Sequence, residues 1–305
     1  MPDEYNDVKR DPVFASILAI HENHLGFSAT LVHSMMCRQL LTAKKHELWF
    51  VFARRPLRFS MQEYHAVTGL KCEDDGNNDL QNFVDDDGFW SRLLKRGNTI
   101  DILSIRNTHL KNVNKWTRID RLRLVYLCVI ASVLMAKNEK VAISEDYIKL
   151  VLDFNKLRAY PWGCHSFDHL VQSIIDTRVN LSRPRSYVLG GFSFAFQVWI
   201  MEAIPDIGTM LGRKLNEVAE VLYPYISSTG NMDVLVSGNY LRDDEMRDER
   251  VDHLNKLIVA DTDWSTLIWE FDDQVRREPP SPEQQEQDAE SETMDDVDDF
   301  RTPCA

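Results

Sequence analysis

Cysteine, histidine and acidic side chains lie close together in the sequence at Cys164, His165, Asp168 and His169. On a helix, His165 and His169 would lie one turn apart, which is the spacing of paired zinc ligands. The segment lacks the glutamate of a metalloprotease motif, however, and no second cysteine pair completes a tetrahedral set. We therefore expect neither a metal nor a cofactor, and assign these side chains to surface or capping roles.

The five cysteines are scattered, and no two of them form a C-x-x-C motif: Cys37, Cys72, Cys128, Cys164 and Cys304. An odd, sparse set behind a polar N-terminus without a secretion signal is typical of reduced thiols inside the cell, in the nucleus or the cytoplasm. The longest apolar run, 124–136, would span only about 20 Å as a helix, which is too short for a bilayer. We therefore expect no membrane partner.

Basic side chains are concentrated between residues 92 and 123. Nine lysines and arginines face two aspartates over 32 residues, and Trp90 and Trp116 lie beside them. A basic stripe with aromatic neighbours is typical of a surface that contacts phosphates and stacks bases. Alternatively, the charges are solvated or pair within the molecule, with the acidic loop 73–88 or the acidic tail. The candidate nucleic-acid contacts are Arg92, Lys95, Arg96, Arg106, Lys111, Lys115, Arg118, Arg121 and Arg123.

The net charge of −13 comes almost entirely from the C-terminal fifth of the chain. Residues 1–240 carry 28 Lys/Arg and 27 Asp/Glu, whereas the remaining 65 residues carry 7 and 21. The last thirty residues hold too few large apolar side chains to offset chain entropy. We therefore predict a helical domain over 1–226, a linker and partly helical acidic segment over 227–272, and a disordered acidic tail over 273–305.

Local patterns predict a mainly α fold, with a compact helical domain and one small β-hairpin near residues 48–59. The β-rich run 48–52 is too short for an independent helix, and a turn and a return strand follow it. Apolar residues at helical spacing predict helices over most of the remaining domain. Downstream, Val251, Leu254 and Ile258 predict a thin apolar stripe on a charged helix within 241–259.

Residues 60–69 specify a short helix at both ends. Ser60 and Glu63 are placed to form a capping box, and Gly69 fits the left-handed position that ends a helix. Farther along, Tyr160-Pro161-Trp162-Gly163 interrupts the helical pattern. We favour a structural interpretation of this tetrapeptide: the proline stops a helix, the glycine permits a positive φ, and the two rings bury large areas at the corner.

Three sets of fragments carry a family resemblance: Phe59–Tyr64 with Thr68–Cys72; Tyr160–Gly163; and Gly191-Phe192 with Ala195, Gln197–Trp199 and Glu202–Pro205. In this order and spacing they resemble a plant family of domains of unknown function. Its members often lie upstream of a SUMO-protease-like (ubiquitin-like-specific cysteine protease) domain, in genes that look derived from mobile elements. The resemblance covers about 46–210. We assign structural roles to the motif residues Ser60, Glu63, Gly69, Tyr160, Pro161, Trp162, Gly163, Trp199 and Pro205.

That family has no established activity, so the resemblance implies a relative and no reaction. A protease of the accompanying type needs His, Asp, an oxyanion-hole Gln and a Cys that usually lies between Asp and Gly, and no Asp-Cys-Gly sequence occurs here. We expect a non-catalytic protein-interaction or targeting module that lacks its protease domain and binds an unidentified protein. One alternative is nucleic-acid binding through 92–123 with the acidic tail as autoinhibitor; another is a cysteine hydrolase using Cys164 or Cys72.

Overall fold

The computed structural model describes residues 2–73, 80–178, 187–211 and 242–267, with residues 240 and 269. Within them the fold is mainly helical with one two-stranded antiparallel sheet, as the sequence predicts. The stretch 227–239 of the predicted linker and the predicted disordered tail, 273–305, lie outside the described residues. No described helix is long and apolar enough to cross a membrane.

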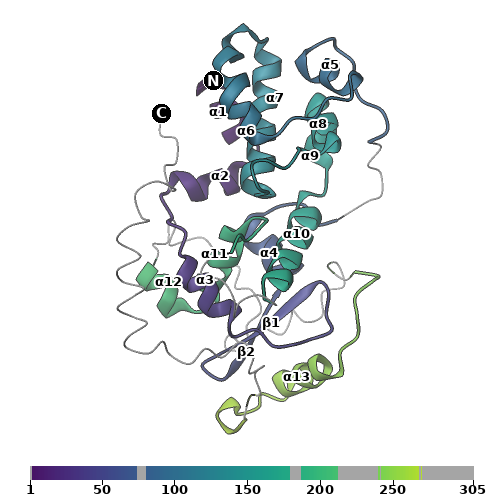
Figure 1. Ribbon diagram of the computed structural model, residues 1–305. Coiled ribbons are helices and arrows are strands. Elements are labelled where there is room, and N and C mark those ends of the chain that lie inside the picture. The colour runs from purple at the N-terminus through teal and green to yellow at the C-terminus, as the bar shows by residue number, and fades with distance from the viewer. Residues whose placement is uncertain are drawn as a thin grey trace, which may run out of the picture.

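The helices and strands follow one another along the chain as shown in Figure 1: α1 (Pro2–Lys9), α2 (Ala15–Glu22), α3 (Ala29–Met36), β1 (Glu47–Phe52), β2 (Arg55–Ser60), α4 (Met61–Thr68), α5 (Phe89–Lys95), α6 (Ile102–Ser104), a π-helix (Ile105–His109), a 3-10 helix (Leu110–Lys115), α7 (Arg118–Cys128), a π-helix (Val129–Leu134), α8 (Glu145–Leu152), α9 (Phe154–Ala159), α10 (Trp162–Arg178), α11 (Ser193–Ala203), α12 (Pro205–Leu211), α13 (Glu249–Val259) and a 3-10 turn (Trp264–Thr266).

The hairpin is buried on both of its faces. Strands β1 and β2 are joined by the two-residue turn Ala53-Arg54, in which both residues have positive φ values, 47° and 65°, as the right-handed twist of a hairpin requires. Successive side chains alternate between the faces. Phe50 and Phe59 enter the main core, whereas Trp49 belongs to a second, separate core. We call the side that carries Trp49 the outer face.

An aromatic cluster joins the inner face of the hairpin to the helices above it. The Phe59 ring lies 5.1 Å from both Phe196 and Trp199 of α11 and 5.8 Å from Phe167 of α10, measured between ring centroids. In Figure 1, α4, α10 and α11 lie directly above the hairpin. All four of these rings are fully buried, so they form the centre of the lower half of the molecule.

The upper half contains a helix that the sequence pattern did not predict. Helix α1 is polar, yet Val8 and Glu4 are buried, and α1 packs against α7. Burial opposes ionisation of Glu4, but the hydrogen bond from Arg121 (2.7 Å), the charge of Arg121 and the other hydrogen bonds to this carboxylate together outweigh it and lower the pKa of Glu4 to about 2. A salt bridge therefore holds in place a segment whose composition resembles a solvated terminus.

Side-chain caps and a proline set the boundaries of three helices, one of which differs from the prediction. Ser28 accepts a hydrogen bond from Leu31 N at the start of α3. The C-terminal helix starts at Glu249 rather than 241, because Asp248 is its N-cap. Pro205 occupies the first position of α12, where its missing N–H costs nothing. Helix α11 ends at Ala203, and α12 starts at this proline two residues later.

Candidate docking site on the hairpin

The first set of motif residues forms a buried polar junction between β2 and α4. Glu63 is fully buried and accepts from Ser60 N (2.7 Å), from the Ser60 hydroxyl and from Arg58 Nη2 (2.9 Å). The capping box is thus confirmed, and Arg58 supplies the opposite charge that a buried carboxylate needs. Gly69 ends α4 with a φ of 69°, as predicted.

The Tyr160–Gly163 tetrapeptide is a corner, but its glycine acts differently from the prediction. Gly163 lies inside α10, and its φ is not positive. Its N–H donates to Lys71 O (2.8 Å), and an added Cβ would come within 2.3 Å of Cys72 Sγ and 2.6 Å of Lys71 O. The expectation of a positive φ is wrong: glycine is required because the backbone after α4 presses against α10. Trp162 is buried and donates to Leu157 O (2.8 Å).

The candidate metal ligands of α10 point to different partners. Cys164 donates to the carbonyl of Cys72 (2.8 Å), His165 stacks on Tyr160 with ring centroids 4.8 Å apart, and Asp168 pairs with Arg242. His169 Nε2 is buried without a hydrogen-bond partner, and burial lowers the pKa of this imidazole. Across the described ranges, no group of three His, Cys, Asp or Glu side chains is placed to hold a metal ion.

Of the two cysteines considered as nucleophiles, Cys72 lies in surroundings that disfavour a thiolate. Burial, with Cys164 beside it, raises the pKa of Cys72 to about 12, whereas a reactive cysteine has a lowered pKa. A thiol–imidazole contact exists elsewhere, between Cys37 Sγ and His33 Nε2 (3.5 Å). His33 Nδ1 faces the Tyr187 hydroxyl (3.0 Å), so the carboxylate that orients the base in a catalytic triad is replaced by a phenol.

The nine basic residues between 92 and 123 separate into two groups. Five form ion pairs within the molecule: Lys95 with Asp85 and Asp87, Arg106 with Glu139, Arg118 with Asp7, Arg121 with Glu4, and Arg123 with Asp86 and Asp120. The acidic loop before α5 is therefore a partner of this segment. Arg92, Arg96, Lys111 and Lys115 are exposed and make no ion pair with any residue that the structure describes.

The outer face of the hairpin is covered by a distant part of the chain, residues 242–269. Trp49 is 1% exposed and packs in one cluster with Val251, Leu254, Ile258 and Trp264. The predicted stripe on the charged helix is thus confirmed, and its partner is this face. In Figure 1, α13 lies beneath the hairpin. We call residues 242–269 the docking segment.

Acidic side chains of the docking segment bind the backbone that leads into β1. Asp248 accepts from Ala43 N (2.6 Å), and the two carboxylate oxygens of Glu245 accept from Lys45 N (2.9 Å) and His46 N (3.0 Å). These amides belong to a loop, so no strand or helix uses them. Asp248 also caps α13 and pairs with Arg250 (2.8 Å); these contacts lower the pKa of Asp248 well below its usual range.

A charged clamp ties the docking segment to α10. The His46 ring lies between two carboxylates. Its Nδ1 is 3.3 Å from Asp168 Oδ1, and its Nε2 is 2.9 Å from Asp244 Oδ1. Arg242 pairs with the other oxygen of Asp168. Asp168 of α10, His46 of the loop before β1 and the start of the docking segment therefore meet at one point, although they are far apart in the sequence.

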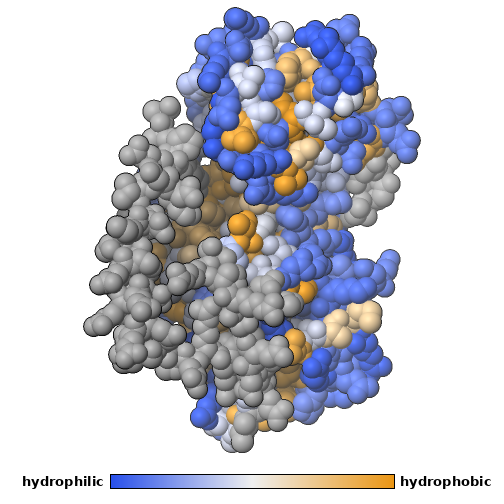
Figure 2. All heavy atoms as spheres, viewed as in Figure 1, coloured by the Kyte–Doolittle hydropathy of each residue, from blue (hydrophilic) through white to orange (hydrophobic). Residues whose placement is uncertain are grey.

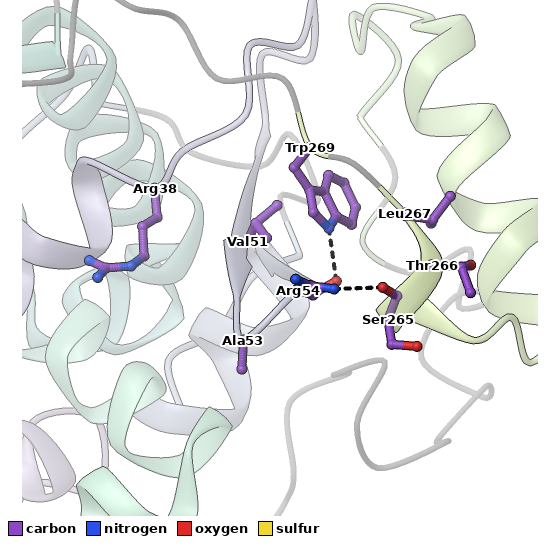
Figure 3. Close-up of a pocket in the computed structure, with 8 residues that line it drawn as sticks. All are labelled: Arg38, Val51, Ala53, Arg54, Ser265, Thr266, Leu267 and Trp269. Carbon is purple, nitrogen blue, oxygen red and sulfur yellow. Dashed lines mark hydrogen bonds between the residues drawn. The ribbon is translucent and has the colours of Figure 1, made fainter.

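The far end of the docking segment closes over the hairpin turn. Arg54 Nη1 donates to Ser265 O (2.6 Å), and Trp269 Nε1 donates to Arg54 O (2.9 Å), as Figure 3 shows. Trp269 also stacks near Trp264, with ring centroids 6.1 Å apart. Between this end and the hairpin lies a pocket of about 420 Å³, lined on one side by Arg38 and Val51. The docking segment therefore covers the outer face without filling it.

Comparison with known proteins gives one match, to a family model over part of the chain. Residues 36–173 match the family model described as a domain of unknown function (DUF1985), so the chain contains such a domain. The match includes the first two motif sets, Phe59–Cys72 and Tyr160–Gly163, and ends before the third. It also includes the whole hairpin, but not the docking segment. Searches of curated proteins and of solved structures gave no match.

Proposed function

We propose that this protein is a non-catalytic protein-interaction module whose docking surface is the outer face of the hairpin. The observation that carries the proposal is the cover itself: an amphipathic helix buries its stripe on Trp49, and its acidic flanks satisfy backbone amides of the receiving loop. The partner we propose is a protein segment of the same chemistry, an acidic amphipathic helix followed by a tryptophan. In the free protein, the docking segment occupies the outer face in place of the partner segment.

The position of the docking segment in the chain supports the proposal that a partner segment replaces it on the outer face. Thirty residues separate the end of α12 from Arg242, so the segment meets the hairpin as an added piece rather than as the next element of the fold. Because the segment and the hairpin belong to one chain, the docking segment binds the outer face as an intramolecular ligand, which gives it an advantage over any free partner. A partner segment must therefore bind more tightly than the docking segment or reach the face when it is released.

The motif resemblance supports a narrower setting. Modules with similar motifs lie upstream of SUMO-protease-like domains in plant genes that look derived from mobile elements, and we propose that this chain is a targeting module of that kind. Sparse, scattered cysteines favour action inside the cell, in the nucleus or the cytoplasm.

The test uses the full chain and a matched pair of variants. Val251→Asp places a charge in the stripe, where the side chain is 1% exposed, whereas Val259→Asp makes the same change at a position that is 66% exposed. Hydrogen exchange of α13 should accelerate at least tenfold in the first variant and stay within twofold in the second. Equal exchange in both variants would show that the stripe does not hold the segment.

A fluorescent peptide of residues 242–269 then probes the vacated face. It should bind the Val251→Asp chain at micromolar concentrations and the wild-type chain far more weakly, and adding Trp49→Ala to the first variant should abolish binding, with near-ultraviolet circular dichroism confirming that the core is intact. No binding by Val251→Asp would refute the docking function. A wild-type dimer that Val251→Asp dissociates would also refute it, because a second copy would then supply the segment.

A further inference from the structure

Arg92 of α5 and Arg96, the residue directly after that helix, line a second pocket at the opposite end of the molecule from the hairpin (Figure 1). The pocket has a volume of about 490 Å³, within the range of small-molecule sites. Two arginines, two small polar residues and two aromatic rings line it: Arg92, Arg96, Asn98, Thr99, Phe89 and His109. Figure 2 shows a strongly hydrophilic surface over α5.

The two arginines of this pocket keep their charge available. Lys95, between them in the sequence, is held by Asp85 and Asp87. Arg92 donates to the backbone carbonyl of Asp87, a contact that orients the guanidinium without neutralising it. Arg96 is exposed and has no acidic partner among the described residues. Two unneutralised guanidinium groups, one helical turn apart, can bind a phosphate from two sides.

The aromatic side of the pocket is rigid and uncharged. Phe89 stacks on Trp116 with ring centroids 4.0 Å apart and meets Trp90 edge-on at 4.9 Å. The ring centroids of His109 and Phe89 are 5.2 Å apart. Burial lowers the pKa of His109, which keeps its ring neutral near pH 7. A planar ring that enters the pocket would therefore meet fixed aromatic surfaces.

We propose that this pocket binds one nucleotide unit of single-stranded nucleic acid, with the phosphate on Arg92 and Arg96 and the base against Phe89 and His109. Stacking on aromatic side chains beside a basic groove is how single strands are held without pairing. Asn98 and Thr99 offer hydrogen bonds to the base or sugar. Lys111 and Lys115, on the 3-10 helix that follows His109, can contact the next phosphates. A phosphorylated peptide would use the arginines but leave the aromatic wall without a planar partner.

The docking segment does not use this pocket. Its ion pairs join Arg242 to Asp168, His46 to Asp244, Arg247 to Asp252 and Arg250 to Asp248, and none involves the nine basic residues. The inference is therefore independent of the proposed docking function. The acidic tail, 273–305, which the nucleic-acid alternative above treats as an autoinhibitor, lies outside the described residues.

The test is fluorescence anisotropy of a labelled twelve-nucleotide oligo(dT) and its RNA counterpart with the full chain at low salt. The double variant Arg92→Gln/Arg96→Gln should weaken binding roughly tenfold and lower the slope of log affinity against log salt by about 0.7, since the two arginines hold one phosphate and each phosphate contact on a single strand contributes about 0.7. The control Arg106→Gln/Arg118→Gln removes the same charge from exposed arginines that are paired with Glu139 and Asp7. It should change affinity less than twofold.

His109→Ala separates stacking from charge. It should weaken binding several-fold while leaving the salt slope unchanged, because no charge is lost. Absence of binding at low salt, or equal weakening by the two arginine double variants, would refute the proposal that this pocket binds nucleic acid. An unchanged affinity in His109→Ala would overturn the base position. Equal affinity for duplex, or competition by free nucleoside monophosphate as effective as by the oligonucleotide, would overturn the single strand as ligand.

Discussion

Replacing Gly163 by alanine tests whether the Tyr160–Gly163 corner is required for packing. The new methyl carbon would lie 2.3 Å from Cys72 Sγ, 2.6 Å from Lys71 O and 3.0 Å from Leu70 O. The sulfur can turn aside, but the two carbonyls are backbone, and Lys71 O already accepts from Gly163 N. Either α10 or the chain after α4 must shift.

The magnitude follows from three contributions. Overpacking of this kind costs about 1–3 kcal/mol, and separating Gly163 N from Lys71 O costs about another 1 kcal/mol. Alanine regains at most about 1 kcal/mol through its higher helix propensity. We therefore expect a net loss of about 2 kcal/mol, which lowers the melting temperature by roughly 5 °C in a protein of this size.

Two other glycines provide the controls. Gly26 has nothing within 4 Å of an added Cβ and no positive φ, so Gly26→Ala should be neutral or stabilise by up to about 1 kcal/mol. Gly69 has space but a φ of 69°, so Gly69→Ala should cost about 1 kcal/mol from backbone strain alone. Urea unfolding followed by tryptophan fluorescence measures all three. If Gly163→Ala is as stable as Gly26→Ala, the close approach does not constrain the fold.

Three further changes have defined outcomes. Glu63→Gln should destabilise the protein by about 3 kcal/mol in urea unfolding, because it leaves buried Arg58 without its carboxylate; a loss below 1 kcal/mol would argue against the buried pair. The lowered pKa of Asp248 means that its contribution is complete above the unfolded value of about 4 and is lost as the pH falls below it; α13 should therefore lose hydrogen-exchange protection between about pH 4 and 2, and Asp248→Asn should flatten that profile. At pH 8, Cys72 and Cys128, whose pKa values burial raises to about 12 and 11, should react with iodoacetamide at least tenfold more slowly than a free thiol; rapid labelling with the fold intact would contradict their burial.

Local signals in the sequence were sufficient where short-range physics decides the structure. The Ser60–Glu63 capping box, the end of α4 at Gly69 and the hairpin all depend on neighbours within a few residues, and the structure has them as predicted. The role of Gly163 could not be predicted, because a helical glycine near a proline gives no sign of the distant backbone at Lys71. Helix α1 was missed for the same reason: its buried Glu4 is satisfied by Arg121, more than a hundred residues away.

The docking site shows what pattern reading can and cannot supply. The stripe of Val251, Leu254 and Ile258 is visible in the sequence, and so is the apolar alternation of β1, but nothing in either pattern pairs them. One available signal was that a strand apolar on both faces, with Trp49 between Leu48 and Phe50, needs a second cover. In the basic segment 92–123, composition identifies nine charged residues. It does not distinguish the five that form ion pairs from Arg92 and Arg96.

The motif residues and the docking surface are physically one unit. Glu63 joins the start of α4 to Arg58, and Arg58 lies directly across the strands from Trp49, the residue at the centre of the outer face. Cross-strand neighbours fix one another's positions, so the capping box also sets the place of the side chain that receives the docking segment. On the other side, Asp168 extends from α10, whose start is fixed by Gly163, to His46 and Arg242. The residues that the sequence marks as structural therefore determine the shape of the surface on which the proposed function depends.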